Sequence, residues 1–192
     1  MKIMHVGVKA GRAETEATEA LVLMLCEGDH FSEQSAASID KAMGGALTDL
    51  LKSKEFEGKP GELVLLHAQK TIPAKRVLLV GVGKKASAGL DTIRQAMGYA
   101  AKRVRQAKAT SFTVSVPAFV PRDSSVIEVA QAMAEGAIAA ARDFLDEAKT
   151  RITATRATLD GLSGELRGKR IANAAIFARS AEAAALSFDY KG

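Results

Sequence analysis

Cysteine and long apolar runs are scarce in this 192-residue sequence, and each scarcity excludes something. Cys26 is the single cysteine, so no internal disulfide can form, and its apolar context, ALVLMLCEG, is typical of a small buried side chain. The longest apolar runs, 20–26 and 77–82, fall well below the roughly 20 residues that span a bilayer. The start, MKIMHVGVKAGRAETEA, lacks the long apolar segment of a secretory signal. We therefore expect a cytoplasmic protein without a membrane partner.

Residues for metal or hydrolytic chemistry are also few. Cys26 and His30 are four positions apart, but no second pair matches them, and only His5 and His67 remain to complete a site. No Gly-x-Ser-x-Gly nucleophile motif occurs. The sequence therefore predicts no catalytic residue, no metal site and no cofactor in this chain.

The hydrophobic pattern predicts an α/β fold, because strand-like and helix-like segments alternate. Expected strands are 1–8, 19–26, 62–68, 75–83, 110–118 and the β-branched segment 151–159. Expected helices are 38–51, about 91–107, 124–148 and 165–186. The first segments lack crossover helices, so we expect a three-layer domain with a mixed sheet and helices on both faces.

Two glycine pairs are candidates for special roles. Gly44 and Gly45 fall inside the predicted helix 38–51, where each costs roughly 1 kcal/mol relative to alanine. We interpret them as packing residues that let a neighbouring strand or subunit come close, with a ligand contact as the alternative.

The pair Gly81 and Gly83 ends an apolar strand and precedes a helix, the setting of a phosphate-binding turn. Lys84 and Lys85 could draw an anion toward the helix that starts near Asp91. The third glycine of a dinucleotide motif and the Gly-Lys-Ser/Thr of a P-loop are both missing, and Asp91 is itself a good N-cap. We favour a simple strand-to-helix connection and keep an anion-binding turn as the alternative.

A basic strip is predicted beside the buried stripe of the helix 91–107. It comprises Arg94, Lys102 and Arg105, with Lys108 just beyond. No aromatic residues are interleaved with it, so a solvated face is favoured over a nucleic-acid surface.

Three segments occur in the order and spacing of one known family: IDKAMGGALTDLLKSKEFEGKPGELVLLH, IPAKRVLLVGVGKK and AMAEGAIAAARDF. Together they resemble the N-terminal, macro-domain-like domain of the leucyl aminopeptidases, hexameric cytosol aminopeptidases with a larger catalytic domain. The resemblance covers about residues 1–144 and thins afterwards. It implies a domain at 1–160 and, at 161–192, a helix or linker leading to a catalytic domain.

The family's two metals, zinc or manganese, would be held by that catalytic domain, whose Asp-Ala-Glu-Gly-Arg signature has no counterpart here. MAEGA at 133–137 shares three letters with it but lacks the leading aspartate. The resemblance implies a non-catalytic role in assembly and active-site access, with the catalytic domain of the same protein and other subunits as partners. DNA binding is the alternative function, since some bacterial members of the family bind DNA. ADP-ribose or nucleotide binding, as in macro domains, has less support.

Overall fold

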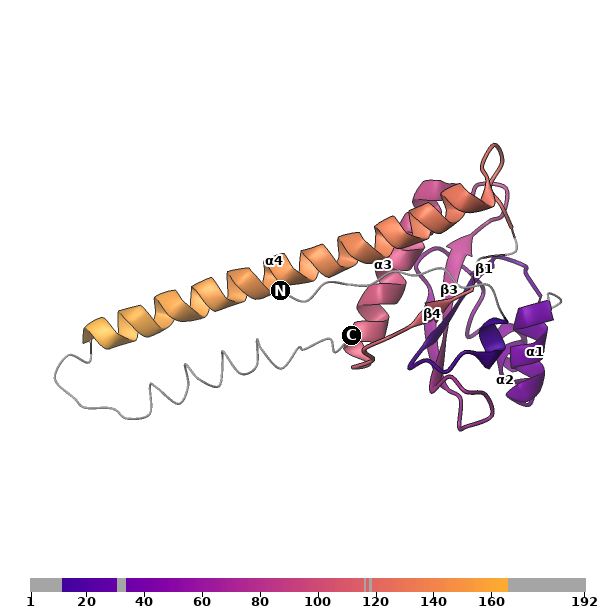
Figure 1. Cartoon of the computed structure of the whole chain (residues 1–192), viewed down its shortest axis with the longest axis horizontal. Coiled ribbons are helices and arrows are strands. Elements are labelled where there is room, and N and C mark those ends of the chain that lie inside the picture. The colour runs from indigo at the N-terminus through magenta and orange to yellow at the C-terminus, as the bar shows by residue number, and fades with distance from the viewer. Residues whose placement is uncertain (1–11, 31–33, 116, 118, 166–192) are drawn as a thin grey trace. The chain divides into compact units, whose positions relative to one another are not determined.

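The computed structural model describes residues 12–30, 34–115, 117 and 119–165. Contacts divide them into two units: the larger extends to Ala140, and the smaller comprises the described residues from Ala141 onward. The elements, labelled in part in Figure 1, are η1 (Ala13–Thr15), β1 (Leu21–Cys26), α1 (Gln34–Ala42), α2 (Ala46–Lys52), β2 (Leu63–His67), β3 (Arg76–Gly83), α3 (Leu90–Gln106), β4 (Thr113–Val114) and α4 (Val126–Glu165).

The four strands among the described residues form one mixed sheet in the order β2-β3-β1-β4. The central strand β1 is parallel to both of its neighbours, β3 and β4. The edge strand β2 is antiparallel to β3. The prediction of a mixed sheet is confirmed.

Successive side chains of the strands enter two cores, one on each face of the sheet. Val22 and Met24 of β1 pack with α3 and the first turns of α4, through residues such as Ile93, Met97, Val129 and Met133. Leu21 and Leu23 pack on the opposite face with Ile39, Leu47 and Phe56. Figure 1 shows α3 on one side of the strands and α1 and α2 on the other. The predicted three-layer α/β fold is confirmed.

The predicted helix 38–51 is in fact two helices, and the glycine pair is where they part. Gly44 and Gly45 have φ of 68° and 86°, a left-handed conformation that glycine adopts without strain. A Cβ on either would meet no atom within 4 Å in the described structure, so close packing is not their role there. The sharp turn instead lets Asp40 of α1 cap α2: its Oδ1 accepts the N–H of Leu47 at 2.9 Å and of Thr48 at 3.0 Å.

Helix α4 contradicts one strand prediction. The segment 151–159 lies within the 40-residue helix α4 and is not a strand. Its β-branched residues alternate with alanine, arginine and leucine, and extending an existing helix needs no new nucleation. Among the described residues of the predicted strand 110–118, the strand comprises Thr113–Val114. The predicted strand 1–8 and helix 165–186 lie outside the described residues, apart from Glu165. None of the described helices is long and apolar enough to cross a membrane.

Candidate functional site at the carboxyl edge of the sheet

The parallel strands β1 and β3 end side by side, because Cys26 and Gly83 are register partners. Ligands of open α/β sheets bind beside such carboxyl ends, so this edge is the expected position of a ligand site. The turn after β1 is tied to the sheet: the N–H of Cys26 donates to Asp29 Oδ2 at 2.8 Å. The N–H of Glu27 donates to the carbonyl of Gly83 at 2.9 Å.

Gly81 and Gly83 belong to β3, and their N–H groups bind the backbone of the segment 58–62. The N–H of Gly81 donates to the carbonyl of Glu62 at 2.9 Å, and that of Gly83 to the carbonyl of Gly58 at 2.8 Å. A Cβ on Gly81 would lie 2.0 Å from the carbonyl oxygen of Lys59. Both amides are therefore used within the chain, which argues against the anion-binding turn considered at these glycines.

Lys84 and Lys85 follow β3 directly and are exposed. They precede α3, but the N-cap of this helix is Gly89, whose N–H donates to Thr92 Oγ1 at 3.3 Å. The prediction that Asp91 is the N-cap is wrong. Asp91 sits in the first turn, where its carboxylate accepts a hydrogen bond from Arg94.

Arg94 is part of the contact between α3 and α4. Its Nε donates to Glu135 Oε2 and its Nη1 to Asp91 Oδ1, both at 2.6 Å. The hydrogen bond to Glu135, with a smaller contribution from Asp91, raises the pKa of Arg94, and the same bond lowers the pKa of Glu135. The backbones are close here, because a Cβ on Gly136 would lie 2.2 Å from the carbonyl oxygen of Arg94. Arg94 therefore stabilises helix packing.

The other basic candidates lie at the far end of α3. This helix has 17 residues, a length of about 25 Å, and Lys102 and Arg105 lie in its second half. Lys108 has φ of 57° and follows the helix, where the N–H of Ala109 donates to the carbonyl of Val104 at 3.2 Å. This is a Schellman-type helix end, which requires a left-handed residue. The six basic candidates, which are these residues with Arg94, Lys84 and Lys85, therefore do not form one continuous surface.

Metal-ligating side chains do not gather anywhere in the described part of the chain, where no group of three or more His, Cys, Asp or Glu residues could hold an ion. Cys26 is buried at 2% exposure and forms no disulfide. The described residues therefore do not fit the two-metal centre of a peptidase.

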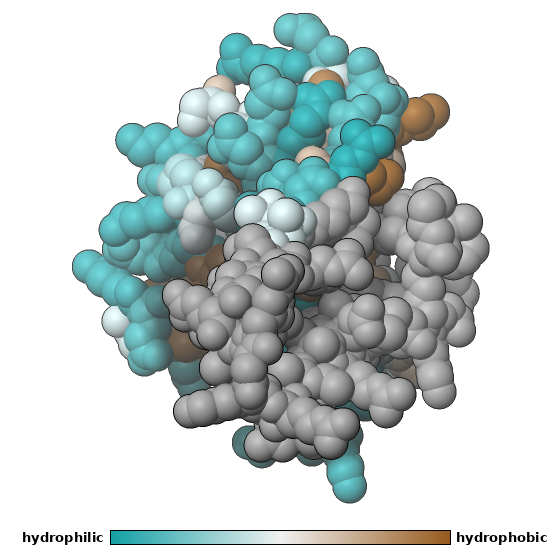
Figure 2. Space-filling model, turned by 90° about the vertical axis from the view of Figure 1, so that its left-hand side faces the viewer, coloured by the Kyte–Doolittle hydropathy of each residue, from teal (hydrophilic) through white to brown (hydrophobic). Residues whose placement is uncertain are grey.

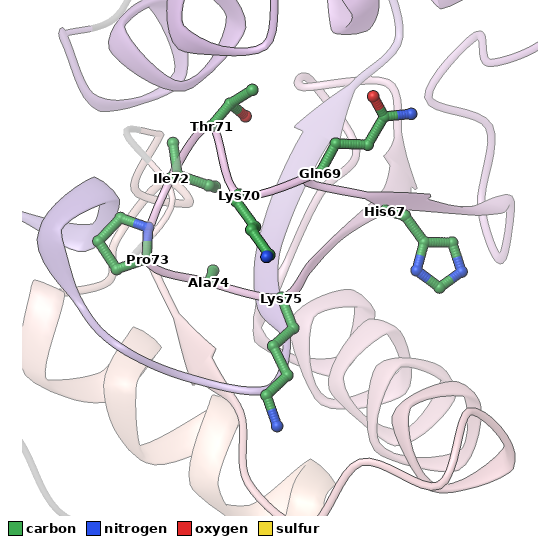
Figure 3. A pocket seen from close by; sticks show the side chains of 8 residues that line it. All are labelled: His67, Gln69, Lys70, Thr71, Ile72, Pro73, Ala74 and Lys75. Carbon is green, nitrogen blue, oxygen red and sulfur yellow. The ribbon is translucent and has the colours of Figure 1, made fainter.

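A concave site at the β2–β3 turn was not predicted from the sequence. It has a volume of about 680 Å³, and Figure 3 shows the eight residues that line it, His67 and 69–75. Gln69 and Lys70 have φ of 47° and 67°, as in a type I′ turn, and the N–H of Thr71 donates to the carbonyl of Ala68 at 2.8 Å. Neither central residue is glycine, so the sequence carried no signal for this turn.

Glu19 joins three segments at the amino end of the sheet. Its Oε1 accepts a bond from Lys75 Nζ at 2.8 Å, and its Oε2 accepts the N–H of Thr110 at 2.6 Å and its hydroxyl at 3.1 Å. These bonds, that of Lys75 above all, lower the pKa of Glu19 to about 2. The charged form of Glu19 is thus a structural tie between β1, the β2–β3 loop and the end of α3.

The α/β fold is macrodomain-like. The macrodomain of Mycobacterium tuberculosis DarG superposes with a TM-score of 0.55 at 16% identity, covering 67% of this chain and 86% of that one. A mutant tomato leucine aminopeptidase gives a TM-score of 0.52 at 24% identity, covering 65% of this chain and 25% of that one. At these identities the likeness concerns the fold alone.

The sequence itself is more specific. The profile described as "Cytosol aminopeptidase family, N-terminal domain" matches residues 22–151. A probable cytosol aminopeptidase of Alkaliphilus oremlandii is 32% identical over 77% of this chain and 29% of its own length, and one of Geobacter sp. (strain M21) is 38% identical over 59% and 23%. The chain belongs to the cytosol aminopeptidase family, through its N-terminal domain. It spans about a quarter of the length of these curated relatives.

Proposed function

We propose that this chain is the non-catalytic N-terminal domain of a cytosolic leucyl aminopeptidase, where it acts in subunit assembly and in shaping access to the active sites. The observation that carries the proposal is the profile match over residues 22–151, which concerns the N-terminal domain of the family. The partners are then the catalytic domain of the same protein and further subunits of a homo-oligomer.

Peptide hydrolysis is attributed to another segment of the protein. The relatives are named probable cytosol aminopeptidases, and each is about four times as long as the part that this chain matches. The described residues offer no cluster of metal ligands. We propose a domain at 1–160 and a connecting segment at 161–192 that leads to the part of the protein that binds two zinc or manganese ions.

The gene's reading frame beyond the codon for Gly192 is the first test. We expect it to continue into a segment with the family's Asp-Ala-Glu-Gly-Arg signature. A stop codon directly after Gly192 would overturn the accessory role in a peptidase.

The second test is activity. The purified 192-residue chain, supplied with manganese or zinc, should not hydrolyse leucine p-nitroanilide, while a full-length cytosol aminopeptidase serves as the positive control. Hydrolysis by the chain alone would contradict the non-catalytic assignment.

DNA binding is the second candidate, motivated by the exposed Lys84 and Lys85 at the carboxyl edge. Its support is weaker, because Arg94 is engaged with Glu135 and the remaining basic residues lie toward the other end of α3. A nucleotide or ADP-ribose site at Gly81 and Gly83 has less support still, since both amides donate to the chain's own carbonyls.

A further inference from the structure

Strand β2 leaves one edge of the described sheet open. It is the terminal strand in the order β2-β3-β1-β4, and the opposite terminal strand, β4, has only two residues. The sequence of β2 is Leu-Val-Leu-Leu-His, without a charged residue, a proline or a glycine. Natural edge strands are commonly protected by lysine, proline or a bulge, and β2 has none of these.

The register shows which backbone groups face the open edge. The N–H of Gly81 donates to the carbonyl of Glu62, and the N–H of Ala68 to the carbonyl of Lys75. Bonded and non-bonded pairs alternate along an antiparallel ladder, and the pairing runs from Leu63 with Val80 to His67 with Arg76. Val64 and Leu66 therefore bond to β3, while Leu63, Leu65 and His67 direct their N–H and C=O groups outward.

No hydrogen bond to another described residue occupies these outward groups. The strand is nevertheless held firmly, because Leu63 and Leu65 pack against one core and Val64 and Leu66 against the other. Exposed apolar side chains do not offer a comparable surface. The large ones in the described structure are Tyr99, Val120, Val126, Ile127 and Ile138. On the face in Figure 2, hydrophobic colour occurs as small spots among hydrophilic residues.

We propose that β2 pairs antiparallel with β2 of a second copy of this chain, about a two-fold axis at Leu65. The outward residues 63, 65 and 67 are symmetric about Leu65, so this register sets Leu65 opposite Leu65 of the partner subunit and Leu63 opposite His67 of the partner subunit. Three such pairs exchange about six main-chain hydrogen bonds. Because β2 carries no charged residue, self-pairing sets no like charges opposite one another.

The proposal rests on the assembly role proposed above and assigns it to one edge of the sheet. A second copy is the proposed occupant because the homo-oligomer proposed above supplies an identical β2 edge, and because an uncharged strand pairs with itself without bringing like charges together. The two sheets would join into one continuous sheet across the dimer.

Residue-resolved hydrogen exchange of the full chain tests the pairing directly. As protein concentration rises and dimer forms, the amides of Leu63, Leu65 and His67 should gain protection, while those of Val64 and Leu66 stay protected at all concentrations. A chain that stays monomeric at every soluble concentration overturns the proposal. So does a dimer that leaves the exchange of the three outward amides unchanged.

A matched pair of variants tests the same edge. His67 is exposed and its N–H faces outward. His67→Pro therefore removes a donor of the proposed intermolecular pairing and breaks no hydrogen bond to β3, whereas His67→Ala removes only the imidazole. By sedimentation, His67→Pro should raise the dimer dissociation constant at least about tenfold over His67→Ala. Equal dimer dissociation constants for the two variants contradict the self-pairing of β2. If an unrelated extended peptide then protects the amides of Leu63, Leu65 and His67, the edge binds such a peptide instead of a second copy.

Circular dichroism checks whether each variant is folded. If His67→Pro is unfolded, hydrogen exchange of the native chain alone decides whether β2 pairs with a second copy. Neither substitution bears on the reading frame or on leucine p-nitroanilide hydrolysis, so the aminopeptidase assignment stands or falls separately.

Discussion

The absence of a side chain at position 81 determines how the loop 58–62 lies across β3. A Cβ at Gly81 would approach Lys59 O to 2.0 Å and the carbonyl carbon of Gly58 to 2.7 Å, both of them backbone atoms that cannot rotate away. We therefore expect Gly81→Ala to lower the free energy of unfolding by about 1–3 kcal/mol, the usual cost of overpacking. Urea denaturation measures it.

Gly98→Ala is the control for this substitution, because a Cβ there meets its nearest atom at an ordinary 3.8 Å. It should leave the unfolding free energy unchanged or raise it, because alanine favours a helix. A Gly81→Ala protein as stable as Gly98→Ala would show that the loop 58–62 does not lie against β3.

Glu19 gives the stability of the protein a pH dependence in acid. Its folded pKa of about 2 lies below the ordinary glutamate pKa of 4.5, so the charged form stabilises the fold above pH 4.5, and this contribution is lost as the pH falls toward 2. Glu19→Gln should cost about 1 kcal/mol at pH 7, the net worth of such bonds, and progressively less in acid.

Urea denaturation at a series of pH values measures this difference, and Lys75→Gln with the double variant completes a mutant cycle. A difference between Glu19→Gln and the native chain that stays constant from pH 7 to pH 2 would refute the role of the Glu19 charge.

At the scale of elements, the corner between α1 and α2 depends on Asp40. Its carboxylate binds the N–H groups of Leu47 and Thr48 and the hydroxyl of Thr48, and so fulfils an N-cap role from the preceding helix. Asp40→Ala should destabilise the protein by about 1–2 kcal/mol. Thermal unfolding compares the loss of stability with that of the control Asp49→Ala, which changes an exposed acidic residue of α2. Equal losses would contradict the capping role.

The crossing of α3 and α4 makes a second prediction. Gly136→Ala would press a methyl group against the carbonyl of Arg94 at 2.2 Å and separate the helices, whereas Gly98→Ala meets its nearest atom at an ordinary 3.8 Å. We expect Gly136→Ala to cost about 1–3 kcal/mol and Gly98→Ala to be neutral or stabilising, because alanine favours a helix. Urea denaturation of both variants tests this, and a stabilised Gly136→Ala protein would be the contrary result.

Long periodic elements could be predicted from the sequence, and features set by distant neighbours could not. The strand 75–83 and the helix 91–107 were found nearly at their observed bounds because their patterns are strong. The break at Gly44 was missed because a left-handed turn and a tolerated helical glycine read alike in sequence. The role of Gly81 depends on residues 58–62, and the open edge of β2 depends on which residues bond to β3, a property of register.

For the molecule as a whole, charge is the property that bears on DNA. The formal net charge is +5, and the exposed lysines among the six basic candidates lie in two groups, Lys84 with Lys85 and Lys102 with Lys108, separated by most of the length of α3. Because Arg94 is paired with Glu135, no single surface unites all six basic candidates. We expect only weak duplex binding, with a salt dependence corresponding to about two phosphate contacts.

Two charge reversals separate a DNA site from bulk attraction. Each Lys→Glu change removes two charges, so Lys84→Glu with Lys85→Glu and Lys102→Glu with Lys108→Glu both take the net charge from +5 to +1. If attraction is general, fluorescence anisotropy with duplex DNA should show equal losses of affinity. A loss of affinity confined to the Lys84 and Lys85 variant would locate a DNA site at the carboxyl edge. A salt dependence of the affinity that corresponds to about six phosphate contacts would contradict the separation of the basic residues, because only one joined surface could make so many contacts at once.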